Sequence, residues 1–142
     1  MPVTAKAEYA CLAMLELAAR YAEGRPVRLS EVTDKHGIHH GFLVQILLQL
    51  RNKGLVMTTR GKSGGYQLAK PPNEITLADI VEVLDGLDQA ENRGGTTSAF
   101  GQKLQGVWSG LAKKMADTRT GYLKKFTLSD LLPNDSVPDY II

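Results

Sequence analysis

The stretch from residue 29 to residue 70 constrains the fold more than any other part of the chain. Apolar spacing and turn residues divide it into short elements. The expected elements are a helix over 29–36, a tight turn over 37–39, a helix over 40–52, and two strand-like runs, 55–60 and 66–68, around the glycine turn 61–65. This order is typical of a winged helix-turn-helix, a fold that reads DNA.

Positive charge is concentrated in the same part of the chain. Residues 1–70 contain 10 Lys/Arg and 5 Asp/Glu, whereas residues 71–142 contain 7 and 10. The segment 51–70 holds five basic residues and no acidic one, namely Arg51, Lys53, Arg60, Lys62 and Lys70. The alternative is a basic hairpin that is solvated and binds nothing. The position of the basic segment directly beside the two predicted helices favours binding to the phosphates of double-stranded DNA.

Length and composition exclude several classes of protein. The chain has 142 residues, enough for one domain with an arm, and contains neither a signal-peptide pattern nor an apolar run that could span a membrane, so we expect a cytoplasmic protein. Its one cysteine, Cys11, excludes an internal disulfide framework. No nucleophile, base and orienting group can be assembled, so an enzyme is not expected.

Two further helices should pack with the winged helix-turn-helix and complete an N-terminal unit, here called the head. Residues 4–22 carry an apolar stripe, namely Tyr9, Cys11, Leu12, Met14, Leu15, Leu17 and Ala18, with alanines between them. A short helix should begin at the N-cap candidate Thr76, which is followed three residues later by Asp79. Residues 88–99 are polar and without period, and read as a loop whose ordering would need a partner.

A second amphipathic helix lies outside the head. Its stripe consists of Phe100, Leu104, Val107, Trp108, Leu111 and Met115. Little else in the chain could bury this stripe, so we expect a homodimer, whose two recognition helices would read a palindromic operator. The expected protein is mainly α with a small β-hairpin wing, and comprises a head (1–86), a loop (87–99), a dimerisation helix with a short C-terminal helix (100–132) and a tail (133–142).

The residues expected to contact DNA lie at the second helix and in the wing. They are His39, His40, Gly41, Phe42, Gln45, Arg51, Arg60, Gly61 and Lys62. Gln45 can bridge an adenine, His40 can donate to a phosphate or a guanine, and Phe42 either touches a thymine methyl or packs inside the protein. Arg60 and Lys62 could enter a minor groove or neutralise phosphates.

Three histidines in this region, His36, His39 and His40, also invite a metal hypothesis. Their spacing crosses the boundary between helix and turn, and no cysteine or carboxylate cluster completes the set. We therefore expect DNA contacts from this region and no metal site.

A series of motifs over roughly residues 1–132 resembles the Rrf2 family of dimeric winged-helix regulators. The motifs are Glu8-Tyr9-Ala10, Leu29-Ser30-Glu31-Val32, Gly37-Ile38, Phe42-Leu43-Val44-Gln45, Leu50-Arg51-Asn52-Lys53-Gly54-Leu55-Val56, Arg60-Gly61 and Gly64-Gly65-Tyr66-Gln67-Leu68. The resemblance implies that Arg60 is the wing arginine that enters the minor groove. Gly41 and Val44 differ from the residues of the cluster-binding members, so the operator sequence cannot be carried over.

The iron-sulfur cluster that some members of the family bind is not expected in this chain. Members with an iron-sulfur cluster place three cysteines in the loop equivalent to residues 88–99 and its following turn, and a ligating histidine at the position of Gln105. This chain has no cysteine there, so we expect no cofactor and a protein closer in type to the cluster-free cysteine regulators of the family. Glu8 and Cys11 resemble a ligand arrangement of some relatives, but two ligands are too few.

The last residues, Asp139, Tyr140, Ile141 and Ile142, resemble the C-terminal peptide by which serine acetyltransferase enters the active site of O-acetylserine sulfhydrylase. The alternative to binding this enzyme is a tail that packs on the dimer. The leading hypothesis is a homodimeric repressor without an iron-sulfur cluster, linked to cysteine and sulfur metabolism through this tail. Two alternatives stay open: a redox or small-ligand sensor with a cofactor bound between chains, and a tail-mediated inhibitor of the sulfhydrylase.

Overall fold

The structure is a computed structural model that describes residues 3–86 and 98–133. Its elements are α1 (Ala5–Ala19), α2 (Leu29–His36), α3 (His40–Asn52), β1 (Val56–Thr59), β2 (Gly65–Leu68), the 3-10 helix η1 (Pro72–Glu74), α4 (Leu77–Asp85), α5 (Ala99–Leu123) and α6 (Leu128–Leu131). The fold is therefore mainly helical with one antiparallel hairpin, as the sequence predicts. No helix among the described residues has the length and apolar character needed to cross a membrane.

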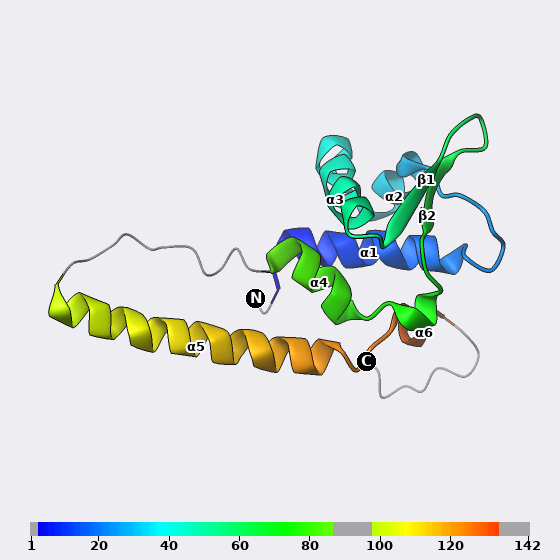
Figure 1. Cartoon of the computed structure of the whole chain (residues 1–142). Helices are drawn as coiled ribbons and strands as arrows, with labels where there is room; N and C mark the ends of the chain where they lie inside the picture. The colour runs from blue at the N-terminus through cyan, green and yellow to red at the C-terminus, as the bar shows by residue number, and fades with distance from the viewer. Residues whose placement is uncertain (1–2, 87–97, 134–142) are drawn as a thin grey trace.

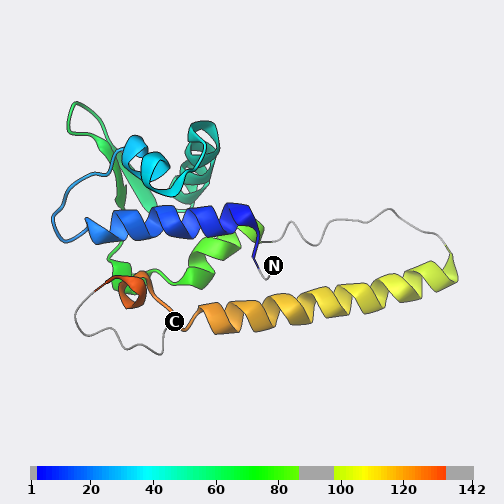
Figure 2. The same ribbon diagram turned by 180° about the vertical axis from the view of Figure 1, so that it is seen from behind.

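The elements form a head and a long arm. In the head, α1 lies between α2, α3 and the hairpin on one side and α4 and α6 on the other (Figures 1 and 2). The arm is α5, which passes below α4 at its C-terminal end and extends away from the head (Figure 1). Most of the predicted loop and the predicted tail lie outside the described residues.

Helix α1 forms the centre of the core, with a buried face that coincides with the predicted stripe only in part. Its fully buried positions are Ala7, Ala10, Ala13, Met14, Leu17 and Ala18, whereas Tyr9, Cys11 and Leu12 are only half-buried. Alanine side chains are short, so a face of alanines lets a neighbouring helix approach the α1 backbone closely. The predicted stripe is confirmed for Met14, Leu17 and Ala18, but it did not include the three buried alanines, because hydrophobicity alone ranks these small residues below their larger neighbours.

The segment that follows α5 returns to the head. The Leu77 amide donates to the Phe126 carbonyl and the Leu128 amide donates to the Ile75 carbonyl, both at 2.9 Å. Leu128 is completely buried in the same core as α1 and α4. Helix α5 is thus attached to the head at its C-terminal end by α6, with its N-terminal end furthest away (Figure 1).

Candidate nucleic-acid interface

The helix-turn-helix has the predicted elements and boundaries. Gly37 ends α2 with φ 64°, a left-handed conformation that glycine adopts without a steric penalty. Ile38 is buried beneath the turn and His39 is the extended residue that precedes α3. The turn thus fixes the start of α3, where a recognition helix meets base edges.

Helix α3 divides into a buried face and an exposed face. The buried face consists of Leu43, Ile46, Leu47 and Leu50. The exposed face, here called the reading face, carries His40, Gly41, Phe42, Gln45, Leu48 and Arg51. Five of these six residues were predicted to contact DNA, and the structure brings them together on one surface.

Leu48 is the residue of the reading face that the sequence prediction missed. Its side chain is 45% exposed although it lies in a run of apolar residues. The available signal was helical spacing, since Leu48 follows Gln45 by three residues and precedes Arg51 by three. An outward leucine offers the apolar contact that a thymine methyl accepts.

Phe42 lies at the edge of the reading face. Its ring stands perpendicular to that of Tyr9 with centroids 5.8 Å apart, and its side chain is still 36% exposed. An edge-to-face pair of this kind stabilises the contact between α3 and α1. Part of the Phe42 ring therefore packs against Tyr9 inside the protein, which was one of the two predicted alternatives. The exposed part of the side chain is accessible to a ligand.

The wing comprises β1, β2 and the connecting residues 60–64. The strands pair in antiparallel register from Val56 opposite Leu68 to Thr59 opposite Gly65. Arg60, Gly61 and Lys62 lie at its exposed tip, as predicted. The hairpin contains no acidic residue that could neutralise the exposed side chains of Arg60 and Lys62.

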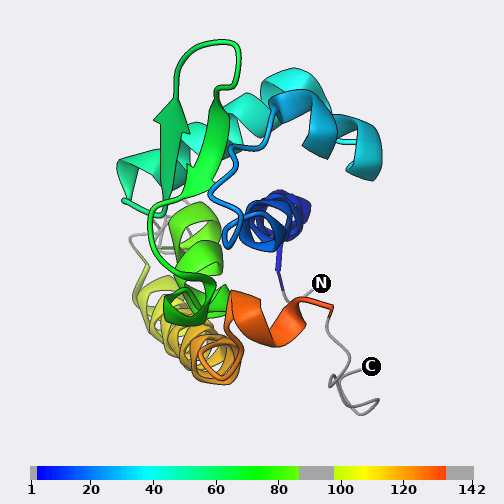
Figure 3. The ribbon, with the colours of Figure 1, turned by 90° about the vertical axis from the view of Figure 1, so that its right-hand side faces the viewer.

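A third extended segment joins the wing. The Val27 amide donates to the Tyr66 carbonyl and the Tyr66 amide donates to the Val27 carbonyl, each at 2.8 Å. A Cβ atom at Gly65 would overlap the Val27 carbonyl oxygen, so the close approach requires glycine there. Figure 3 shows the segment before α2 running beside the hairpin.

Arg28 connects this segment to the tip of the wing. Its Nη2 donates to the carbonyl oxygen of Lys62 at 2.6 Å, and its backbone amide donates to Glu31 Oε2 at 2.8 Å. At the other end of the segment, Gln67 Nε2 donates to the Gly24 carbonyl at 3.0 Å. These bonds hold the wing in a fixed position relative to α2. Neither Arg28 nor Gln67 was among the residues predicted to contact DNA.

A polar cluster attaches α2 to α1. Glu16 Oε1 accepts hydrogen bonds from Lys35 Nζ at 2.9 Å and pairs with His36 Nε2 at 3.0 Å. Burial alone would raise the pKa of Glu16, but the hydrogen bonds and charges of Lys35 and His36 outweigh it, and the pKa lies below its ordinary value. His36 is thus engaged inside the head, away from the exposed His39 and His40, and within the described ranges no three metal-binding side chains converge.

The one cysteine lies in an environment that disfavours its thiolate. Burial, followed by the charges of Asp85 and Glu8, raises the pKa of Cys11 to about 11. Asp85 is itself buried and accepts hydrogen bonds from the Thr4 amide at 3.1 Å and the Thr4 hydroxyl at 2.5 Å. A protonated thiol is a poor metal ligand, so Cys11 fits a packing role.

Helix α5 carries the six residues predicted to form a dimer contact. Phe100, Leu104, Val107, Trp108, Leu111 and Met115 are each at least half exposed within one chain. The side of α5 that is partly covered is a different one, and carries Ala116, Arg119, Thr120 and Leu123. The structure therefore places the predicted stripe on one continuous apolar surface that the head does not cover.

Known proteins are similar to this chain in both sequence and fold. The regulator IscR of Photorhabdus laumondii is 34% identical over 140 residues, which cover 98% of this chain and 84% of that protein. The solved structure of T. potens IscR has a TM-score of 0.65 at 31% identity, and covers 91% of this chain and 84% of that one. The structure of CymR, the global cysteine regulator of B. subtilis, has a TM-score of 0.68 at 29% identity, and covers 91% and 94%.

The family model described as Rrf2, iron-dependent transcriptional regulator, matches residues 3–134, which include the head, α5 and α6. The winged head, the reading face and the relatives agree on a DNA-binding transcriptional regulator and not an enzyme. The chain belongs to the Rrf2 family of transcriptional regulators.

Proposed function

We propose that this chain works as a homodimeric repressor that reads a palindromic operator without an iron-sulfur cluster. The observation that carries the proposal is the apolar stripe of α5. Phe100 is 89% exposed and Trp108 is 55% exposed, on a helix that its own head covers only at the C-terminal end. A second copy of the same stripe is the partner that would remove these side chains from water in a two-fold arrangement.

Dimerisation would give the reading face its function. One head presents only a few side chains to the bases, whereas two heads related by a two-fold axis present the same set to two half-sites. In each half, Gln45 and His40 would meet base edges in the major groove, while Arg60 and Lys62 would contact the minor groove and the phosphates. The combined contacts raise affinity and impose the symmetry of the operator.

The oligomeric state tests the proposal directly. We expect multi-angle light scattering to give twice the 15.5 kDa chain mass for the parent, and one chain mass for a variant carrying Trp108→Glu and Leu111→Glu. The matched control carries Gln102→Glu and Lys113→Glu on exposed positions of α5 outside the stripe, and should stay dimeric. An operator obtained by selection from random DNA should bind the control and lose about 100-fold affinity for the stripe variant. A monomeric parent would contradict the proposal.

The available ligands support the part of the proposal that concerns the cluster. Cys11 is half-buried with a raised pKa, and the sequence has no second cysteine. The family resemblance implies that Gln105 stands where cluster-binding members have a histidine. This set does not fit an iron-sulfur cluster held by several thiolates. Protein purified without oxygen should contain no stoichiometric iron and should bind the operator equally with and without a chelator. Iron that is needed for DNA binding would favour the alternative of a cofactor shared between chains.

A second candidate, regulation by cysteine supply, is supported by the similarity to CymR and by the sequence of residues 139–142, which lie outside the described residues. Titration of the chain with O-acetylserine sulfhydrylase, followed by the fluorescence of its pyridoxal phosphate, tests this link. A saturable change that requires residues 139–142 and is reversed by O-acetylserine would support it. If the complex forms but the dimer binds no DNA, the chain would instead be an inhibitor of the sulfhydrylase.

A further inference from the structure

One large apolar side chain of the reading face lies outside the protein core. Leu48 is 45% exposed, whereas Ile46 and the other leucines of α3 are at most 2% exposed. The residues three before and three after it, Gln45 and Arg51, are exposed polar side chains on the same face of the helix. Leu48 therefore belongs to the surface of α3 that is available for contact with another molecule.

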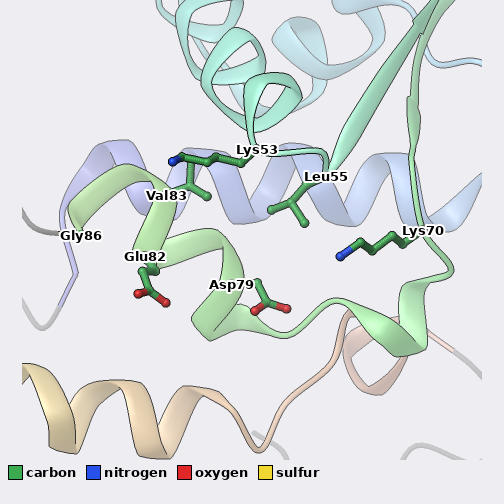
Figure 4. Close-up of a pocket in the computed structure, with 7 residues that line it drawn as sticks. All are labelled: Lys53, Leu55, Lys70, Asp79, Glu82, Val83 and Gly86. Carbon is green, nitrogen blue, oxygen red and sulfur yellow. The ribbon is translucent and has the colours of Figure 1, made fainter.

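The exposure of Leu48 does not arise from a frayed helix end. Helix α3 continues beyond it to Asn52, and the Leu55 amide then donates to the Leu50 carbonyl at 3.0 Å. Both of these leucines are buried. Figure 4 shows this end of α3, where Lys53 and Leu55 lie close to α4. The helix is thus held firmly on both sides of its outward leucine.

The side chains of α3 limit which bases this helix can recognise directly. In the major groove a carboxylate accepts a hydrogen bond from the amino group of cytosine, whereas an apolar side chain contacts the C5-methyl group of thymine. Helix α3 contains neither Asp nor Glu, and Leu48 is its most exposed aliphatic side chain. Of the two pyrimidines, the helix is therefore equipped for thymine.

Helical spacing places Leu48 close to the base pair that Gln45 would contact. Three residues advance a helix by about 4.5 Å, and neighbouring base pairs are about 3.4 Å apart, so the two side chains reach neighbouring positions in the groove. We propose that Leu48 is a specificity-determining residue that recognises the C5-methyl group of a thymine next to the base read by Gln45. This inference rests on the part of the proposed function in which α3 enters the major groove, and it does not require the dimer.

Deoxyuridine tests the contact, because it differs from thymidine only in lacking the C5-methyl group. Each thymine of an operator selected from random DNA is replaced in turn, and the affinity of the full chain is measured by fluorescence anisotropy. We expect one thymine of a half-site to matter, with about fourfold weaker binding for each methyl group removed there. Specific binding that depends on no thymine methyl would overturn this inference alone. A selection that yields no preferred sequence would overturn the proposed function as well.

Leu48→Ala tests which residue makes the contact. In this variant, replacement of the same thymine by deoxyuridine should no longer change the affinity, because the two changes remove the same interaction. The matched control is Asn52→Ala, at an exposed position one turn further along α3, which should keep the fourfold methyl effect. Circular dichroism verifies folding, and Leu48→Gln, which is similar in size, replaces Leu48→Ala if the latter is unfolded. An undiminished methyl effect in a folded Leu48 variant would show that another side chain contacts the thymine, and would overturn the proposal.

Discussion

Arg28 contributes to the position of the wing through a hydrogen bond to the Lys62 carbonyl. Arg28→Ala removes a charge-assisted bond of about 1–2 kcal/mol, so we expect operator affinity to fall roughly tenfold in fluorescence anisotropy titrations. Arg25→Ala in the same segment is the control, because the ion pairs of Arg25 with Glu23 and Glu31 are longer, at 3.8 and 3.4 Å, and do not involve the wing. Arg28→Ala should also be non-additive with Arg60→Ala, since both act through the wing. Additive effects would show that Arg28 acts independently of it.

Glu16 should make the stability of the head sensitive to acid. Its pKa in the folded chain lies below the ordinary value of 4.5, so its contribution is complete above that pH and is lost as the pH falls through the folded value. At pH 7 we expect Glu16→Gln to lower the free energy of unfolding by about 1–2 kcal/mol, measured by urea titration, and the difference from the parent should shrink below about pH 4. Glu23→Gln, an exposed control, should show no such convergence. A difference that is constant with pH would contradict this role.

These residue-scale contacts also mark the limit of sequence analysis. Gln45 and Arg60 could be predicted because helical spacing and turn position determine where their side chains project. Arg28 and Glu16 could not, because their partners lie 34 and 20 residues away and spacing along a chain describes only local neighbours. Leu48 is intermediate, since its spacing was informative but its apolar character pointed to the core.

At the scale of elements, Thr4 joins the start of α1 to the end of α4. Its hydroxyl accepts from the Ala7 amide at 3.1 Å and donates to the buried Asp85. Thr4→Val should lower the free energy of unfolding by about 2–3 kcal/mol, because it removes an N-cap and leaves a buried carboxylate with one donor fewer. Thr127→Val removes the N-cap of α6, where Asp130 is exposed, and should cost only about 1 kcal/mol. Equal losses in urea unfolding would show that Asp85 gains little from Thr4.

The boundaries of α2 and α3 were more predictable than the buried face of α1. The end of α1 itself was predicted at residue 22, whereas the helix ends at Ala19. The helices α2 and α3 have the predicted ends, because glycine at 37 and apolar periodicity act locally. The alanine face of α1 depends on the close approach of its neighbours, and the return of α6 to the head depends on a strand-like pairing of Thr76 with Thr127. Pairings of this kind across about 50 residues of sequence leave no periodic signal.

On the scale of the whole molecule, α5 would set the distance between the two heads of the proposed dimer. The helix has 25 residues, so it is close to 38 Å long at about 1.5 Å per residue, and within the described residues it is attached to the head at its C-terminal end. Two chains joined by such helices would hold their reading faces at a fixed separation. That separation is a property of the dimer, and neither the reading face nor the wing determines it alone.

A rigid dimer should therefore tolerate little change in the spacing of its half-sites. Inserting about five base pairs at the centre of a selected operator places the half-sites on opposite faces of the duplex, and inserting about ten returns them to the same face at one turn greater separation. We expect the first insertion to reduce affinity by about 100-fold in gel-shift titrations, and the second to restore little of it, because α5 cannot lengthen. The control is a palindrome with substituted central bases and unchanged spacing, which should bind nearly as the original does. Full recovery with the longer insertion would mean that the heads move independently, and equal affinity for all spacings would mean that each head binds its half-site alone.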